Sequence, residues 1–100
     1  MNVIKTTQTF NAWLESFKDI AISRRIKERI ARLEYNHFGD YKALGEGLYE
    51  LRLDFAAGYR IYYIRKGNVI YLLLNGGDKG TQSRDIEKAR KIAAQFSDET

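Results

Sequence analysis

The sequence has no cysteine and no proline, and it contains a single histidine, His37. Without cysteine, disulfide bonds, thiol catalysis and thiolate metal sites are excluded. A lone imidazole argues against a histidine metal cluster and against a Ser-His-Asp triad. No apolar run approaches the ~20 residues that cross a bilayer, and no apolar signal segment opens the chain. We therefore expect a cytoplasmic protein that uses no metal and no cofactor.

The chain has instead the composition of a packed protein. Hydrophobic residues make up 44% and aromatic residues 13% of its 100 residues, which predicts one domain over residues 1–100. Lysine and arginine outnumber aspartate and glutamate by 17 to 13, giving a net charge of +4. This excess is compatible with RNA, DNA or an acidic protein as partner, but it is too small to establish one.

The N-terminal third predicts a short strand followed by two helices. Residues 2–7 form a β-type run, and Thr7 or Thr9 can cap a helix whose apolar stripe continues to about Ile20. Asp19 is the expected N-cap of a second helix. Together the two helices form an αα-hairpin. The second stripe consists of Ile22, Ile26, Ile30 and Leu33.

Beyond residues 35–47, which we interpret as loop, the apolar period changes to two. Strands are predicted over 51–55 and 59–65, joined by a hairpin loop at 56–58, and over 69–74 after a Gly67-Asn68 turn. The last of these is apolar throughout, which predicts an interior strand covered on both faces. An irregular segment at 75–80 then precedes a helix over about 83–96. The order β-α-α-β-β-β-α predicts an α+β fold, with helices on one face of a mainly antiparallel sheet.

This register places a group of polar side chains on one sheet face. With 56–58 as the loop, Arg52 pairs with Tyr62 and Asp54 with Arg60, while the second turn sets Arg60 opposite Asn75. All five therefore share a face. The opposite, core face carries Leu51, Leu53, Phe55, Ile61 and Tyr63.

Lys79 follows Asn75 closely, so two guanidiniums, an ammonium and a phenol converge at one end of the sheet. Such a set suits a phosphate, because arginine offers a planar fork and lysine a point charge. An equally compatible interpretation is that Arg52 and Arg60 pair with Glu50 and Asp54 on a solvated face.

Other candidate motifs give weaker evidence of function. The basic run from Arg24 to Arg32 could contact a phosphate backbone, but a solvated helix face explains it more simply. Gly76-Gly77 has no following Lys-Ser/Thr pair and is therefore no P-loop.

Several short motifs occur together in a familiar order. They are Leu48-Tyr49-Glu50-Leu51-Arg52, Gly58-Tyr59-Arg60-Ile61-Tyr62, Leu72-Leu73-Leu74-Asn75-Gly76-Gly77-Asp78-Lys79, Gln82 and Asp85-Ile86. In this ordered combination the chain resembles the RelE/ParE superfamily of bacterial toxin–antitoxin toxins, most closely its HigB-like addiction module killer branch. The family's fold, β-α-α followed by a β-meander, agrees with the organisation predicted above.

The resemblance implies a toxin that cleaves mRNA in the ribosomal A site without metal. The ribose 2′-OH would attack the adjacent phosphate, leaving a 2′,3′-cyclic phosphate and a 5′-OH. By position, Arg60 would be the phosphate-stabilising cation and Arg52 the second, while Lys79 would neutralise the leaving group or the phosphate. The C-terminal tyrosine or histidine of some relatives is missing after Lys79, so Tyr62 is the substitute as base or stacking residue. Candidate RNA-binding residues are Arg65, Asn75, Arg24 and Arg25.

The resemblance also implies partners. These are a helix-turn-helix antitoxin that covers the basic face, the ribosome with its mRNA, and operator DNA bound by the toxin–antitoxin complex. No membrane partner is implied. Two alternatives remain open: a non-enzymatic ParE-like inhibitor of DNA gyrase, and an inactive relative that only binds the antitoxin.

Overall fold

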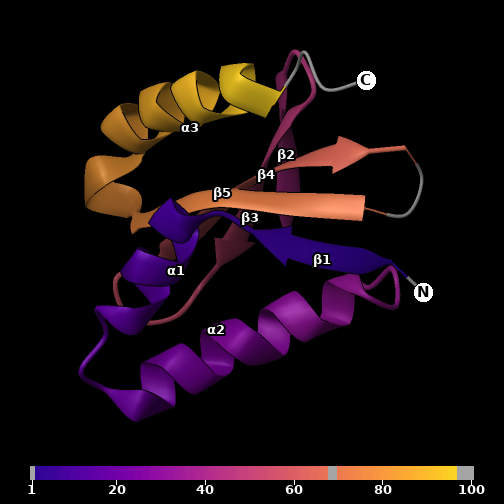
Figure 1. Cartoon of the computed structure of the whole chain (residues 1–100). Helices are drawn as coiled ribbons and strands as arrows, with labels where there is room; N and C mark the ends of the chain where they lie inside the picture. Colours follow the sequence, from indigo (N-terminus) through magenta and orange to yellow (C-terminus); the bar gives the residue numbers. More distant parts are fainter. Residues whose placement is uncertain (1, 68–69, 97–100) are drawn as a thin grey trace.

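A five-stranded sheet lies between two helical layers in the computed structural model, which describes residues 2–67 and 70–96 (Figure 1). The strand order is β1-β5-β4-β3-β2, and β1 is parallel to β5 while the other neighbours are antiparallel. This confirms the predicted α+β class. The elements are β1 (Val3–Thr6), α1 (Gln8–Glu15), α2 (Ile20–Leu33), β2 (Tyr41–Gly45), β3 (Leu48–Leu53), β4 (Tyr59–Lys66), β5 (Ile70–Asp78), a 3₁₀ turn (Lys79–Thr81) and α3 (Gln82–Phe96).

Both predicted helix caps are present. The Thr7 hydroxyl accepts a hydrogen bond from the Phe10 amide at 3.0 Å, and the Asp19 carboxylate accepts one from the Ala21 amide at 2.9 Å. Each cap satisfies an amide that has no partner within its helix. The first helix nevertheless ends at Glu15 rather than near Ile20, because the Asp19 cap needs extended backbone immediately before α2.

Helices α1 and α2 cover one face of the sheet, as predicted. Their apolar side chains pack on the strand residues of that face in one buried cluster. The strand residues of this cluster are Leu51, Leu53, Tyr59, Ile61, Tyr63, Tyr71 and Leu73.

Helix α3 covers the opposite face, so the prediction that all helices pack on one face is wrong (Figure 1). A second apolar cluster, Leu48, Tyr62, Leu74 and Ala89, lies beneath this helix. The cause is that the second face is apolar over part of its area, and this apolar surface is stabilised by burial. The interior strand β5 is thereby covered on both faces, as predicted.

The segment 35–47 is not all loop, because Tyr41–Gly45 forms the edge strand β2. Glu46 and Gly47, with φ of 55° and 81°, make the tight connection to β3, as the positive φ values of a type I′ hairpin require. Because the side chains of this edge strand are mostly exposed, residues 41–45 show no alternation of apolar and polar residues from which a strand could be predicted.

The hairpin registers differ from the predicted ones. Leu53 pairs with Tyr59 and Arg52 with Arg60, a shift of two residues that makes 54–58 the loop. Because side chains alternate with a period of two, this shift leaves the paired residues of β3 and β4 on their predicted faces, but Asp54 and Phe55 fall in the loop instead of the strand.

Strand β5 extends to Asp78, so the segment predicted as irregular is mostly strand. A bulge near Leu74 places Asn75 opposite Tyr62 and Gly77 opposite Arg60. Asn75 therefore shares the Tyr62 face as expected, although with a different partner. The predicted two-residue turn falls partly on residue 68, outside the described residues.

Candidate functional site

Two rows of residues cross β3, β4 and β5 on the sheet face covered by α3, at the end where α3 begins. In each row the residues lie directly opposite one another in the antiparallel pairing. The first row is Arg52, Arg60 and Gly77, and the second is Glu50, Tyr62 and Asn75. The structure thus brings together four members of the predicted polar set, whereas the fifth, Asp54, lies in the β3–β4 loop and lines a pocket beside α2.

Arg60 is the buried cation of this set, with 6% of its surface exposed. Its Nη1 donates to the main-chain oxygens of Gly58 at 3.2 Å and Tyr59 at 3.0 Å. Its Nε is buried and has no hydrogen-bond partner among the described residues. Arginine keeps its charge even when buried, so Arg60 presents a fixed positive charge with an unused donor.

Lys79 lies beside Arg60 at the β3–β4 loop. A methyl group built on Gly58 would come within 2.8 Å of Lys79 Cδ and 3.8 Å of Arg60 Nη1. Gly58 also has a φ of +73°, so both its conformation and its surroundings favour glycine. The missing side chain lets the lysine stem pass over the loop while the lysine itself stays exposed.

Arg52 is held by the carboxylate of Glu50, which is buried and does not lie on a solvated face as the pairing interpretation expects. Glu50 is fully buried, and its Oε1 lies 3.0 Å from Arg52 Nε. Its Oε2 accepts a hydrogen bond from Gln82 Nε2 at 2.7 Å. This bond with Glu50 also holds the pKa of Arg52 above its usual range. Glu50 thus orients a guanidinium whose side chain remains 31% exposed.

Tyr62 and Asn75 are buried under α3. Tyr62 has no exposed surface, and its hydroxyl lies near the Glu50 carboxylate without forming a well-aligned hydrogen bond among the described residues. Burial, together with the negative charge of Glu50, raises the pKa of Tyr62 well above its ordinary value. Asn75 Nδ2 donates to the main-chain oxygen of Asp85 at 3.0 Å and so ties β5 to α3. Neither side chain offers a surface on which an RNA base could stack.

The glycine pair at 76–77 lets both helical layers approach β5. A methyl group on Gly76 would come within 2.3 Å of the Trp13 ring of α1. One on Gly77 would come within 1.8 Å of Asp85 Oδ2. The Thr81 hydroxyl donates to that same carboxylate, and the Asp78 carboxylate accepts from the Gly80 amide at 2.7 Å. This junction fixes the chain on both sides of Lys79.

Of the site residues added by the structure, Glu50 had a recognisable sequence signal. It lies two residues before Arg52, so the two share a strand face. Gln82 and Asp85 could not be placed, because their position depends on β5 continuing to Asp78.

The structure separates the remaining RNA-binding candidates from this site. Arg24 and Arg25 lie on α2, across the sheet from α3, and the Arg25 guanidinium carbon sits 3.9 Å from the Phe55 ring centroid. Arg65 projects from β4 to the side opposite Arg60, with its guanidinium carbon 5.2 Å from the Tyr71 ring centroid. None of the three joins the Arg52–Arg60 row.

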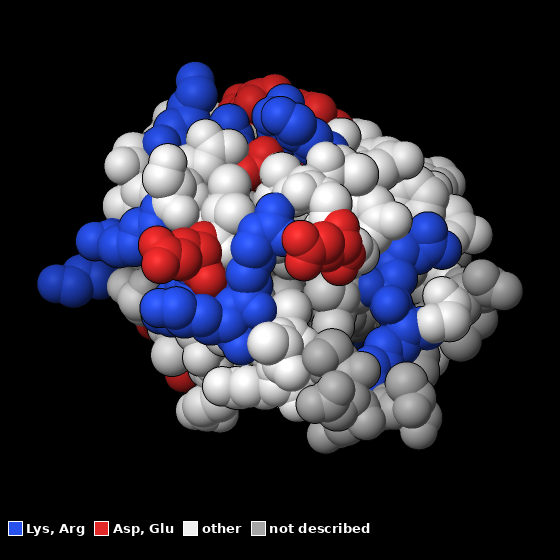
Figure 2. Space-filling view, turned by 90° about the horizontal axis from the view of Figure 1, so that it is seen from above, with Lys and Arg blue, Asp and Glu red and all other residues white. Residues whose placement is uncertain are grey.

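The surface on the α3 side mixes both signs of charge. Figure 2 shows groups of lysine and arginine side chains there, interspersed with aspartate and glutamate, in place of one continuous basic patch. No group of three or more potential metal ligands occurs among residues 2–67 and 70–96. Over the same residues, no helix is long and apolar enough to span a membrane.

Comparison with known proteins places the chain in a family. Residues 12–96 match the family described as phage derived protein Gp49-like (DUF891). The chain belongs to the Gp49-like family. A protein of Haemophilus influenzae described as uncharacterized is 44% identical to this Gp49-like chain over 93 residues, covering 93% of this chain and 94% of that protein.

Two solved structures share the fold of this Gp49-like protein. A chain of the intact E. coli RelBE toxin–antitoxin complex superposes with a TM-score of 0.64 at 16% identity, covering 78% of this chain and 96% of that chain. The isolated E. coli RelE toxin gives a TM-score of 0.64 at 13% identity, covering 88% and 98%. The predicted resemblance to the RelE/ParE superfamily is thereby confirmed at the level of the fold.

Proposed function

We propose that this Gp49-like protein is the toxin of a type II toxin–antitoxin module and cleaves mRNA on the ribosome in the cytoplasm. We further propose a cognate helix-turn-helix antitoxin, whose complex with the toxin binds operator DNA, and a place in the HigB-like branch. The RelE fold supports a toxin, and the solved RelBE complex supports an antitoxin partner. The observation that carries the proposal is the convergence of Arg60, Arg52 and Lys79 at one end of the sheet.

The proposed reaction needs cations more than it needs a nucleophile, because RNA supplies its own. The ribose 2′-oxygen forms a bond to the adjacent phosphorus and loses its proton, while the bond from phosphorus to the 5′-oxygen breaks. The products are a 2′,3′-cyclic phosphate and a 5′-OH. Arg60 and Arg52 stabilise the charge that develops on the phosphorane oxygens. The Lys79 ammonium neutralises the departing 5′-oxygen or donates its proton to it.

The proton acceptor in this proposal comes from the ribosome. Tyr62 is buried, and its raised pKa keeps the phenol protonated. Glu50 is also buried, and both its oxygens already accept hydrogen bonds. Among the described residues, neither is positioned to accept the 2′-OH proton directly. If a ribosomal group is the general base, the protein cleaves mRNA only when it is bound to the ribosome.

The lack of a positioned general base among the described residues favours a second candidate function. A ParE-like inhibitor that binds DNA gyrase needs no general base, and neither does an inactive relative that binds only the antitoxin. Induction of the protein distinguishes these possibilities by what stops first. Early loss of DNA synthesis with intact mRNA indicates gyrase inhibition, whereas early loss of translation with cut mRNA indicates the nuclease.

The proposed site is tested by growth arrest after induction of an Arg52→Ala/Arg60→Ala variant. Removing one group that stabilises transition-state charge typically lowers the rate by about 10²–10³-fold, so we expect the double variant to lose the arrest. Lys91→Ala is the control, because it removes an exposed cation of α3 whose Nζ lies 3.9 Å from Glu87 Oε1. A folded double variant that arrests growth like the unchanged protein contradicts the site.

A further inference from the structure

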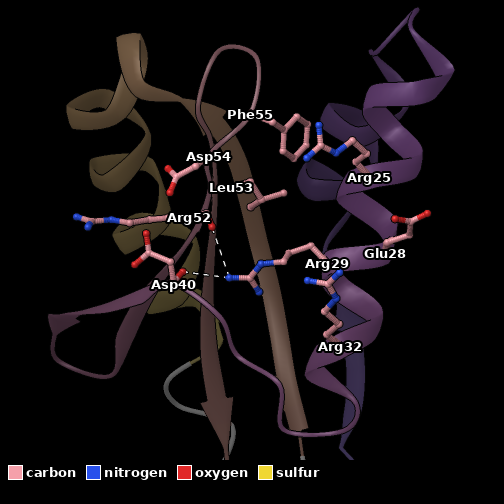
Figure 3. A pocket seen from close by; sticks show the side chains of 9 residues that line it. All are labelled: Arg25, Glu28, Arg29, Arg32, Asp40, Arg52, Leu53, Asp54 and Phe55. Atoms are coloured by element: carbon pink, nitrogen blue, oxygen red, sulfur yellow. Dashed lines mark hydrogen bonds between the residues drawn. The ribbon is translucent and has the colours of Figure 1, made fainter.

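A second cationic region lies between α2 and β3, as a pocket of about 280 Å³ (Figure 3). Three arginines of α2 line it, Arg25, Arg29 and Arg32, and Arg52 of β3 borders it from the other side. In Figure 3 the Arg52 side chain points away from the α2 arginines, toward the side of α3. Arg52 therefore borders this pocket with its main chain, whose oxygen lies 3.5 Å from Arg29 Nη2, and the candidate catalytic site with its side chain.

Arg29 lies at the back of the pocket with hydrogen-bonding capacity to spare. Its Nη2 donates to the main-chain oxygen of Asp40 at 3.2 Å and lies 3.5 Å from that of Arg52. Its Nη1 is buried and has no partner in the described part of the chain. Gly39 makes room for this guanidinium, since a methyl group there would come within 2.4 Å of Nη2. Burial lowers the pKa of Arg29, as expected for a cation removed from water without a carboxylate partner.

Arg25 and Arg32 complete a basic row along α2. Residues at positions i, i+4 and i+7 lie on one helix face, about 6 Å and about 4.5 Å apart along the axis. The Arg25 guanidinium stacks on Phe55, which holds its planar fork in place. Glu28, Asp40 and Asp54 also line the pocket. Yet within residues 2–67 and 70–96 no carboxylate comes within 4.0 Å of the three α2 arginines to form an ion pair.

We propose that this pocket binds a backbone phosphate of the same RNA strand whose scissile phosphate occupies the Arg52–Arg60–Lys79 site. The strand would continue across β3 at Arg52, the residue that the two sites share. This inference rests on the proposed function and extends it by giving the substrate a second anchoring point. An RNA strand fits better than an acidic peptide, because oriented guanidinium forks match phosphate oxygens and a strand repeats its charge at every nucleotide.

The test measures the affinity of the purified protein for a short fluorescent single-stranded RNA with 2′-O-methyl riboses, which it cannot cleave. The variant is Arg25→Gln/Arg32→Gln, and Lys18→Gln/Lys27→Gln is the matched control that removes the same charge outside the pocket, from two exposed lysines before and within α2. We expect the pocket variant to bind at least about tenfold more weakly. The salt dependence should also weaken: the slope of log affinity against log salt concentration should become less negative by about 1.4, because two single-strand phosphate contacts are lost. Circular dichroism checks that both variants fold.

Equal loss of affinity in the two variants would overturn the proposal, since only net charge would then matter. Polyglutamate that competes with the RNA, with the same dependence on Arg25 and Arg32, would also overturn it in favour of an acidic protein partner. The outcome is separable from that for the proposed function. Growth arrest that survives loss of Arg52 and Arg60 contradicts the nuclease, whereas unchanged RNA affinity in the pocket variant contradicts only the second anchoring point.

Discussion

Arg60 shows how a single residue can be prepared for an anion. A guanidinium taken out of water loses solvation energy. The Arg60 guanidinium recovers part of this energy through the hydrogen bonds that its Nη1 donates to the main-chain oxygens of Gly58 and Tyr59. Its Nε remains without a partner in the described residues. In the proposed reaction this buried charge acts on the phosphate through its electrostatic field, so the cost of burial is met before the substrate arrives and the charge needs no reorganisation during the reaction.

Tyr62→Phe tests whether the buried phenol takes part in chemistry. The Tyr62 hydroxyl is buried without a partner, so its removal should leave the free energy of unfolding unchanged or raise it by up to about 1 kcal/mol. Growth arrest should also be unchanged. Tyr71→Phe is the matched control, since its buried hydroxyl likewise lacks a partner among the described residues. Loss of arrest in Tyr62→Phe, with Tyr71→Phe active and both stable, would return a chemical role to Tyr62.

Glu50→Gln tests the carboxylate that positions Arg52. Both Glu50 oxygens accept hydrogen bonds, whereas glutamine offers only one acceptor, so either Arg52 or Gln82 loses its partner. The expected loss in the free energy of unfolding is about 1–3 kcal/mol, measured by urea denaturation, together with weaker growth arrest. Glu87→Gln changes an exposed carboxylate of α3 and should cost less than about 1 kcal/mol. Equal stability of the two variants would contradict this role of Glu50.

At the scale of elements, the junction of β5 with α3 decides where Lys79 lies. Strand β5 passes directly into the 3₁₀ turn, whose N-terminal end is closed by a capping box between Asp78 and Thr81, and α3 follows without a break. Gly77 lets the Asp85 carboxylate approach the strand, and Asn75 binds the first turn of the helix from below. Lys79 therefore stands on a short and well-anchored segment.

Gly77→Ala should disturb this junction through Asp85. Its methyl group would come within 1.8 Å of Asp85 Oδ2, and overpacking of this kind costs about 1–3 kcal/mol. Removing the carboxylate should relieve the clash, so the loss caused by Gly77→Ala should be smaller in an Asp85→Ala background. A double-mutant cycle in urea denaturation measures this coupling, expected at about 0.5–3 kcal/mol. Strict additivity of the two changes would contradict the assigned contact.

The elements themselves were largely predictable because their signals are local. The Thr7 and Asp19 caps and the apolar stripe of α2 each depend on a few neighbouring residues, and the structure confirms them. Strand β2 had no such signal, since an exposed edge strand needs no apolar face. The position of α3 was not predictable either, because its cover of the second sheet face depends on packing between distant segments.

The sequence predicted which sheet face the site residues share, but it did not predict which of them are buried. Alternation placed Arg52, Arg60, Tyr62 and Asn75 on one face, and a register error of two residues did not change that. The sequence could not show that Tyr62 and Asn75 lie beneath α3. Nor could it show Glu50 as the partner of both Arg52 and Gln82, since that arrangement joins β3 to a helix whose position was unknown.

At the scale of the whole molecule, the net charge of +4 is small, but the cations are placed unevenly. One group, Arg60 and Lys79, lies where β4 and β5 meet the start of α3. Another, the arginines of α2, lies across the sheet from α3. Arg52 lies between the two groups, with its main-chain oxygen facing Arg29 and its side chain directed toward α3, as the proposed path of the RNA requires (Figure 3).

The most direct test of the central claim maps the 5′ ends of cellular mRNA shortly after induction. The unchanged protein should produce new ends that carry a 5′-OH and lie within translated reading frames, and the Arg52→Ala/Arg60→Ala variant should produce none at equal expression. Two results would contradict mRNA cleavage by this site. One is that the folded double variant produces the same 5′ ends. The other is that mRNA stays intact in cells that the unchanged protein has already arrested.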